Sequence, residues 1–239
     1  MSDDARPALR AAADARAPAA LATIVGLDGG GPRPVGTQMV VSAGGVSGFL
    51  SGGCLEADVA GHAAEVLRTG APHRLIYGEG SPWPDIRLMC GARIEIVLER
   101  IAPDEAAVAI LLALTDARRP AWWTSDGRRR GCVQADAAAK VSSGAYGKLH
   151  EPVTRLIVLG ADPTALAIAM LGAQAGCETT LVRPKGPAEP PPLPGVAYSR
   201  DTPASALAQI GVDRWTAVAV ATHEAQADHD ALLAALPSR

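Results

Sequence analysis

Two cysteines of this chain stand next to glycine at positions that read as loop ends. Residues 51–56 read SGGCLE and contain Cys54, and Cys90 is followed directly by Gly91. Backbone amides that no side chain covers at a helix start can bind an anion, and the same field favours the reactive thiolate of a cysteine. The stretch at 51–56 therefore predicts an anion site with a sulfur donor beside it.

A second loop sets one cation among glycines and prolines. Residues 29–36 read GGGPRPVG, a composition that forbids regular structure and places Arg33 in a rigid loop. Its planar guanidinium can bind a phosphate through paired hydrogen bonds. Together with the two cysteines, Arg33 predicts a ligand with phosphate and soft-metal character. The alternative interpretation is that the cysteines are small buried apolar residues and that Arg33 is an ordinary surface arginine.

The composition argues against several classes of protein. A formal net charge of −3 and a 3% share of aromatic residues disfavour partners such as nucleic acid and anionic membranes. The four cysteines form no C-x-x-C pair, and the motifs of serine hydrolases, P-loop NTPases and zinc proteases are missing. The N-terminus lacks a signal-peptide core and no apolar run reaches about 18 residues, so a cytoplasmic protein is expected.

The elements that must position these loops mix strands and helices in the first half of the chain. Apolar periodicity predicts helices over 8–17, 55–70 and 103–117, strands over 20–27, 73–78 and 91–101, a hairpin over 37–50, and a strand pair in AWWTS and RGCVQ. This order predicts an α+β domain over residues 1–140.

The pattern changes after a small, polar stretch at 140–152, which is predicted to be a linker. Beyond it, strands and helices alternate, beginning with a strand at 154–161 and a helix at 162–176. Alternation of this kind is typical of a parallel sheet. The expected fold class is thus α/β: the N-terminal α+β domain is followed by a shortened Rossmann-like domain over 153–239.

The Rossmann-like half carries an incomplete dinucleotide fingerprint. Of the three glycines only Gly160 is present, and Asp162 and Pro163 stand where the pyrophosphate would approach the helix. The second strand ends in Arg183 rather than in an acid; this arginine could hold a 2′-phosphate or lie in solvent. An NAD(P)-dependent oxidoreductase is therefore the weaker alternative, and NAD(P) is not the expected cofactor.

Three motifs, in this order and spacing, resemble the XdhC/CoxI family across residues 20–101. They are GPRPVG at 31–36, SGGCLE at 51–56, and the Cys90-Gly91 pair before an RIEI strand. Residues 154–236 are similar to the Rossmann domain of that family. Members of the family continue through further strands beyond the position of Arg239, hence the expectation that this domain is shortened.

The resemblance implies a maturation chaperone without catalytic turnover of its own. Such a protein binds the molybdenum–pterin cofactor, holds it for sulfuration by a cysteine desulfurase, and delivers it to the apo-enzyme of a xanthine dehydrogenase-like molybdenum hydroxylase. Arg33 and the amides of 51–53 would then bind the pterin phosphate, and Cys54 the molybdenum. The site residues that the resemblance implies are Arg33, Gly36, Ser51, Gly52, Gly53, Cys54, Glu56, Cys90 and Gly91.

Two further expectations concern assembly and the alternatives. An uncovered sheet edge invites association, so a homodimer is one expected assembly. Besides the oxidoreductase, the sequence leaves open an interaction subunit whose cofactor site has decayed.

Overall fold

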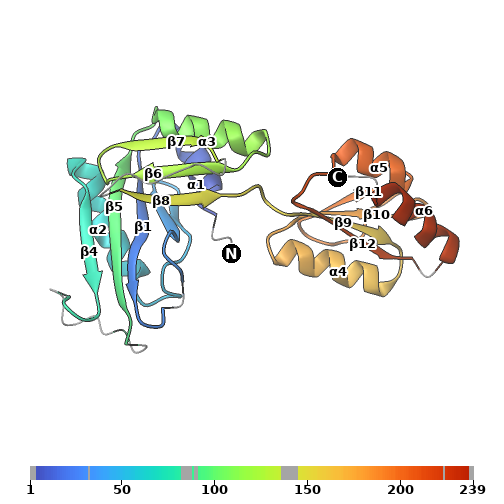
Figure 1. Cartoon of the computed structure of the whole chain (residues 1–239), viewed down its shortest axis with the longest axis horizontal. Coiled ribbons are helices and arrows are strands. Elements are labelled where there is room, and N and C mark those ends of the chain that lie inside the picture. Colours follow the sequence, from blue (N-terminus) through green and yellow to red (C-terminus); the bar gives the residue numbers. More distant parts are fainter. Residues whose placement is uncertain are drawn as a thin grey trace. The chain divides into compact units, whose positions relative to one another are not determined.

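The computed structural model describes residues 4–31, 33–81, 88, 91–135, 145–222 and 224–236. The chain divides into two compact units, Met1–Glu151 and Pro152–Arg239. Figure 1 labels most of the helices and strands of both units. Each unit has its own hydrophobic core and is described by itself.

The first unit is built on a five-stranded antiparallel sheet with the strand order β3-β2-β1-β5-β4. Its strands are β1 (Ala19–Asp28), β2 (Gln38–Ser42), β3 (Gly45–Ser47), β4 (His73–Tyr77) and β5 (Arg93–Ile101). The central pair, β1 and β5, runs in register from Ala19 opposite Ile101 to Asp28 opposite Arg93, with an irregularity between Ile24 and Gly26. The strands and the hairpin predicted from periodicity are confirmed.

Both faces of this sheet are covered, because its strands carry apolar side chains on both sides. Helix α2 (Glu56–Thr69) packs Val59, Ala63 and Val66 against one face and ends at Gly70, whose φ of 75° gives a left-handed cap. The other face is covered by α1 (Arg6–Asp14), α3 (Ala106–Asp116) and a second sheet of β6 (Ala121–Ser125), β7 (Arg130–Gln134) and β8 (Tyr146–His150).

A buried charge network ties the second sheet to β5. Glu99 is fully buried, and its carboxylate accepts hydrogen bonds from Ser125 Oγ (2.7 Å), Arg130 Nε (2.6 Å) and Tyr146 Oη (2.8 Å). Burial lowers the pKa of Arg130, but the charges of Glu99 and Glu105 outweigh burial and raise it. A buried carboxylate is stable only when it is paired in this way.

The predicted linker at 140–152 is wrong for residues 146–150. These residues form β8, which pairs antiparallel with β6 over its whole length, from Ala121 opposite His150 to Ser125 opposite Tyr146. The stretch looks like a linker because its residues are small and polar. In the structure its backbone pairs with β6, and the Tyr146 hydroxyl donates to Glu99. The first compact unit accordingly extends to Glu151 rather than to residue 140.

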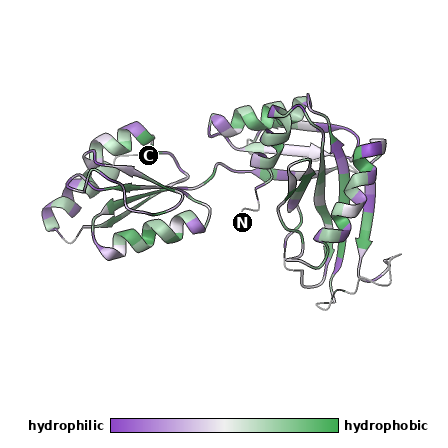
Figure 2. Ribbon diagram, turned by 180° about the vertical axis from the view of Figure 1, so that it is seen from behind, coloured by the Kyte–Doolittle hydropathy of each residue, from purple (hydrophilic) through white to green (hydrophobic). Residues whose placement is uncertain are grey.

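The second unit is a four-stranded parallel sheet in the order β11-β10-β9-β12. Its strands are β9 (Arg155–Gly160), β10 (Glu178–Val182), β11 (Val196–Ser199) and β12 (Thr216–Ala221); its helices are α4 (Pro163–Gln174), α5 (Pro203–Ile210) and α6 (Ala225–Ala235). Figure 2 shows hydrophobic residues concentrated on the strands. Val158 and Leu181 face α4, whereas Leu159 and Val182 face α5 and α6. The expected α/β fold class is confirmed.

Candidate functional site

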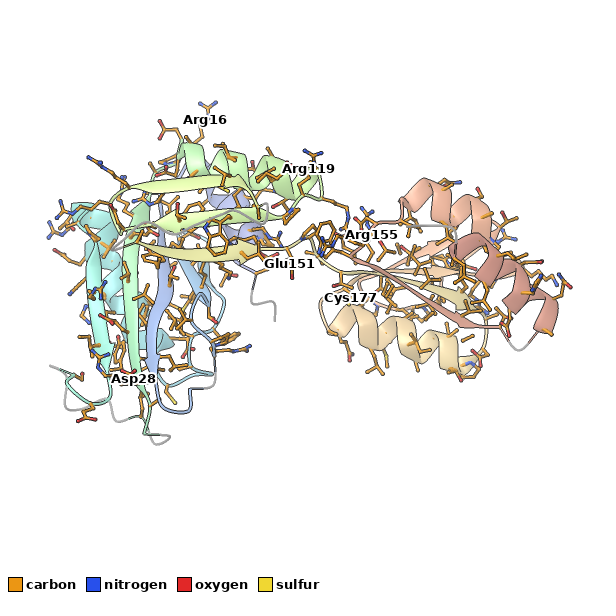
Figure 3. All side chains as sticks on the ribbon, in the orientation of Figure 1. Arg16, Asp28, Arg119, Glu151, Arg155 and Cys177 are labelled. Carbon is orange, nitrogen blue, oxygen red and sulfur yellow. The ribbon has the colours of Figure 1, made fainter. Side chains whose placement is uncertain are left out.

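Three connections of the first unit lie at the same end of the strands of the five-stranded sheet. Because neighbouring strands are antiparallel, the ends of β1, β3 and β4 and the starts of β2 and β5 meet there. Asp28, the last residue of β1, is labelled in Figure 3 and marks this end of the sheet. The described residues of the connections 29–37, 48–55 and 78–92 therefore lie at this end, and they include Arg33, Cys54 and Gly91.

Two of these loops touch. A Cβ atom placed on Gly29, which has a φ of +80°, would lie 3.5 Å from the carbonyl oxygen of Gly91. Gly91 itself has a φ of +71°, and its amide donates to the Leu88 carbonyl at 2.9 Å. Cys90, the second predicted sulfur donor, lies outside the described residues, so its predicted role stays a prediction.

The loop before α2 is organised around the carboxylate of Glu56, the first residue of that helix. Its side chain turns back on the chain and accepts hydrogen bonds from backbone amides of the preceding loop. These donors are Leu50 (2.8 Å), Ser51 (2.7 Å), Gly52 (3.1 Å), Gly53 (2.9 Å) and Leu55 (3.1 Å). The loop thus forms a concave nest of amides, filled by the protein's own anion.

Glycine and serine make this geometry possible. Gly52 and Gly53 have φ values of +85° and +120°, a region that side-chain-bearing residues rarely adopt, and these values turn successive amides toward one point. The Ser51 hydroxyl donates to Glu56 Oε2 at 2.8 Å and accepts from the amides of Cys54 (3.0 Å) and Leu55 (2.9 Å). Buried Leu50 and Leu55 anchor the two ends of the loop in the core below α2.

The electrostatics of the nest follow from these contacts. Partial burial pushes the pKa of Glu56 upward, but hydrogen bonds from the Ser51 amide and hydroxyl and from the Leu50 amide outweigh it and lower the pKa to about 2. Glu56 is therefore ionised at neutral pH. The prediction that the amides of residues 51–53 are uncovered is wrong. These amides already donate to the Glu56 carboxylate, and a phosphate would have to displace it.

Cys54 lies on the outside of this loop and is exposed, whereas Cys132 is buried and Cys177 is half-buried. Burial raises the pKa of the Cys132 thiol to about 11, so that thiol is neutral at physiological pH. Among the cysteines that the structure describes, Cys54 is the one a large ligand can reach. The positive field predicted at Cys54 is opposed by the neighbouring Glu56 carboxylate, which the sequence interpretation did not place there.

Arg33 and Gly36 lie in the connection between β1 and β2. Arg33 is half-buried, and Gly36, at a φ of +90°, donates its amide to the Ile24 carbonyl at 2.8 Å. Gly36 thereby returns the chain to the sheet, so its role in this structure is to shape the loop. A Cβ atom on Gly36 would lie 3.9 Å from Cγ of Lys148, a residue of β8.

Lys148 is a candidate that sequence reasoning missed. Its aliphatic stem lies beside Gly36 of the Arg33 loop, although the two residues are more than a hundred positions apart in the chain. No local signal could have identified it, because its position depends on the pairing of β8 with β6 in a stretch that reads as a linker. Among the described residues, no cluster of three or more His, Cys, Asp or Glu side chains could hold a metal ion.

Comparison with known proteins places the chain in a family. The sequence model of the XdhC and CoxI family matches residues 12–78. The molybdenum cofactor insertion chaperone PaoD of Escherichia coli (strain K12) is 33% identical over 242 residues, which cover 98% of this chain and 70% of PaoD. The chain belongs to the XdhC/CoxI family.

The XdhC/CoxI match covers the Arg33 loop and the Glu56 nest but ends before Cys90 and Gly91. A solved structure described as a xanthine dehydrogenase from Bacillus halodurans has the same fold, with a TM-score of 0.77, 21% identity, and coverage of 98% of this chain and 78% of that one. Within the described part of the chain, no helix has the length and apolar character needed to cross a bilayer.

Proposed function

We propose that the chain binds the molybdenum–pterin cofactor as cargo at the end of the five-stranded sheet where the Arg33, Cys54 and Gly91 loops lie. We further propose that it delivers this cargo to a molybdenum hydroxylase. The observation that carries the proposal is that these loops lie at the same end of the five-stranded sheet. It is supported by membership of the XdhC/CoxI family, in which a relative is named a molybdenum cofactor insertion chaperone.

The side chains at this end of the sheet can bind such a cargo in part. Cys54 offers an exposed sulfur for the molybdenum end, and a Cβ atom on Gly52 or Gly53 would meet nothing within 4 Å, which leaves room beside the thiol. Because Glu56 holds the amides of 51–53, we assign the pterin phosphate to the guanidinium of Arg33. Glu56 keeps the loop in shape and does not bind the cargo itself.

On this proposal the chain has no catalytic turnover. The cargo is held while a cysteine desulfurase supplies the sulfur ligand, and it then passes to the apo-enzyme of a xanthine dehydrogenase-like hydroxylase. The test of this order of events is a transfer assay: the loaded chain should activate the apo-enzyme, and prior treatment with the desulfurase should raise that activation. Equal activation by free cofactor alone would remove the need for a carrier.

The binding step is tested on the protein purified from a molybdenum-replete host. We expect molybdenum and pterin to copurify in equal amounts, and Cys54→Ser to retain about tenfold less of both, a loss of about 1.4 kcal/mol. Cys177→Ser is the matched control, because Cys177 precedes β10 in the other unit. Parent-like retention by Cys54→Ser would show that this thiol does not contact the cargo.

Self-association remains part of the proposal. The strand β12 forms one edge of the parallel sheet, and Leu232, Leu233 and Leu236 at the end of the chain's last described helix are exposed. We expect a homodimer in sedimentation experiments. A monomer at all concentrations would remove it.

A further inference from the structure

The second unit contains a cavity that the proposed cargo site does not use. It has a volume of about 370 Å³ and lies at the carboxyl ends of β9, β10 and β12, between the starts of α5 and α6. Pockets for small ligands have volumes of about 300–1,000 Å³. In open parallel sheets, ligands bind outside the carboxyl ends of the strands where the strand order reverses. In this sheet the order reverses between β9 and β12, beside the cavity.

The cavity has an apolar floor and a charged rim. Leu159, Val182 and Ala231 are buried and line its base. Arg183 and Lys185 follow β10 on the rim, opposite Glu224 and Asp230. A flat apolar ring fits such a floor, whereas phosphate and hydroxyl groups fit such a rim.

On the rim, Arg183 carries a buried donor without a partner among the described residues. Its Nη2 donates to the Ala161 carbonyl at 3.1 Å, which fixes the guanidinium, but its Nε is buried and has no hydrogen-bond partner among the residues that the structure describes. A buried donor without an acceptor costs free energy. An anion in the cavity would supply that acceptor, and the planar guanidinium suits a phosphate.

Lys185 can join Arg183 at small cost. Its ammonium lies 3.6 Å from the Glu224 carboxylate, but both side chains are largely exposed, 89% and 65%. An exposed ion pair of this kind contributes little to stability. Asp230 accepts a hydrogen bond from Gln226 Nε2 at 2.8 Å. These carboxylates can accept hydrogen bonds from the hydroxyl groups of a ribose.

The start of α4 disfavours a second phosphate position. Asp162 caps the helix and its carboxylate accepts from the Ala165 amide at 2.8 Å, while Pro163 has no amide to offer. A dinucleotide places its pyrophosphate at this helix start, where the present chain has a negative charge. The anion site of the cavity is therefore at Arg183 and not at α4.

We propose that the second unit binds a phosphorylated nucleoside in this cavity, with the base on the apolar floor and a phosphate monoester on Arg183 and Lys185. The site is distinct from the cargo site proposed for the first unit. It requires a single phosphate on the ribose and not a bridging pyrophosphate.

Calorimetry on the full chain tests this inference. The probes are the 5′-monophosphates of adenosine, guanosine, cytidine and uridine, adenosine 2′-monophosphate, adenosine, inorganic phosphate and NAD⁺. At least one monophosphate should bind about tenfold more tightly than adenosine and than phosphate. NAD⁺, which has no monoester, should bind no more tightly than adenosine.

Variants separate the phosphate contact from general damage. Arg183→Gln and Lys185→Gln should each weaken the monophosphate about tenfold and leave adenosine unchanged. Arg214→Gln should change neither, because Arg214 precedes the amino end of β12, away from the cavity, and its guanidinium stacks on Trp215. No saturable binding of any monophosphate up to about 1 mM, tighter binding of NAD⁺, or parent-like affinity in both variants would overturn the proposal.

Discussion

The carboxylate of Glu56 should control the stability of the loop that carries Cys54. Glu56→Gln replaces an acceptor of five backbone amides by a group that turns an N–H toward some of them. The pKa of Glu56 falls from 4.5 to about 2, which at about 1.4 kcal/mol per unit corresponds to about 3 kcal/mol in favour of the ionised form. Because the side chain is partly exposed, screening by solvent reduces this value, and we expect a loss of about 1–2 kcal/mol.

The direction with pH follows from the lowered pKa. The stabilising contribution of an ionised carboxylate is complete above its unfolded pKa and is lost as the pH falls through its folded pKa. For Glu56 that window runs from 4.5 down to about 2. The amides of the parent loop should therefore lose protection from exchange across this range. In Glu56→Gln, their protection should be lower at neutral pH and should change less as the pH falls.

Hydrogen exchange read by mass spectrometry on peptides spanning 50–55 is the suitable assay, because it reports local opening. Glu56→Gln should exchange about tenfold faster at pH 7, since 1.4 kcal/mol corresponds to a factor of ten. The matched control is Glu65→Gln on the exposed face of α2; the Glu65 carboxylate pairs with Arg68, away from the loop, so this change should leave the loop unchanged. Parent-like exchange of the loop in Glu56→Gln would refute the role assigned to this carboxylate.

Two further outcomes follow from the second sheet of the first unit. Burial, with Lys148 and Arg6 nearby, lowers the pKa of His150 to about 3. The strand β8 should therefore lose stability as the pH falls from about 6.5 to 3, by up to about 1.4 kcal/mol per pH unit. Hydrogen exchange of the β8 amides should show this loss, and His150→Gln should abolish it. Residues 1–151 should fold alone, whereas 1–140, which lacks β8 and the Tyr146 hydrogen bond to Glu99, should be at least about 2 kcal/mol less stable in thermal unfolding by circular dichroism. Equal melting of the two fragments would contradict the place of β8 in the core.

The sequence predicts much of the fold because local signals and burial agree. The helix over 55–70 has apolar residues at helical spacing and a glycine at its end, and both features decide its real boundaries. The alternating strands of the second half likewise place a parallel sheet without any knowledge of tertiary contacts. Prediction fails at β8, since that strand exists only through its partners β6 and Glu99, which are distant in sequence.

The candidate site shows the same division. The motif at 51–56 identifies the loop and its glycines, but not the direction in which Glu56 points. That direction depends on the positive φ angles of Gly52 and Gly53 and on the Ser51 hydroxyl, which together bring the amides to one carboxylate. The sequence interpretation named Glu56 only as one of the site residues and assigned the amides of 51–53 to the pterin phosphate.

The filled amide nest has a consequence for how a load could be given up. A loop whose amides wait for a ligand rearranges when that ligand departs, and the rearrangement slows or opposes departure. Here the carboxylate of Glu56 keeps every one of those amides satisfied whether or not anything lies against Cys54. Under the proposed function, the empty and the loaded loop can share one conformation, and a handover to an acceptor protein would need no refolding of this loop.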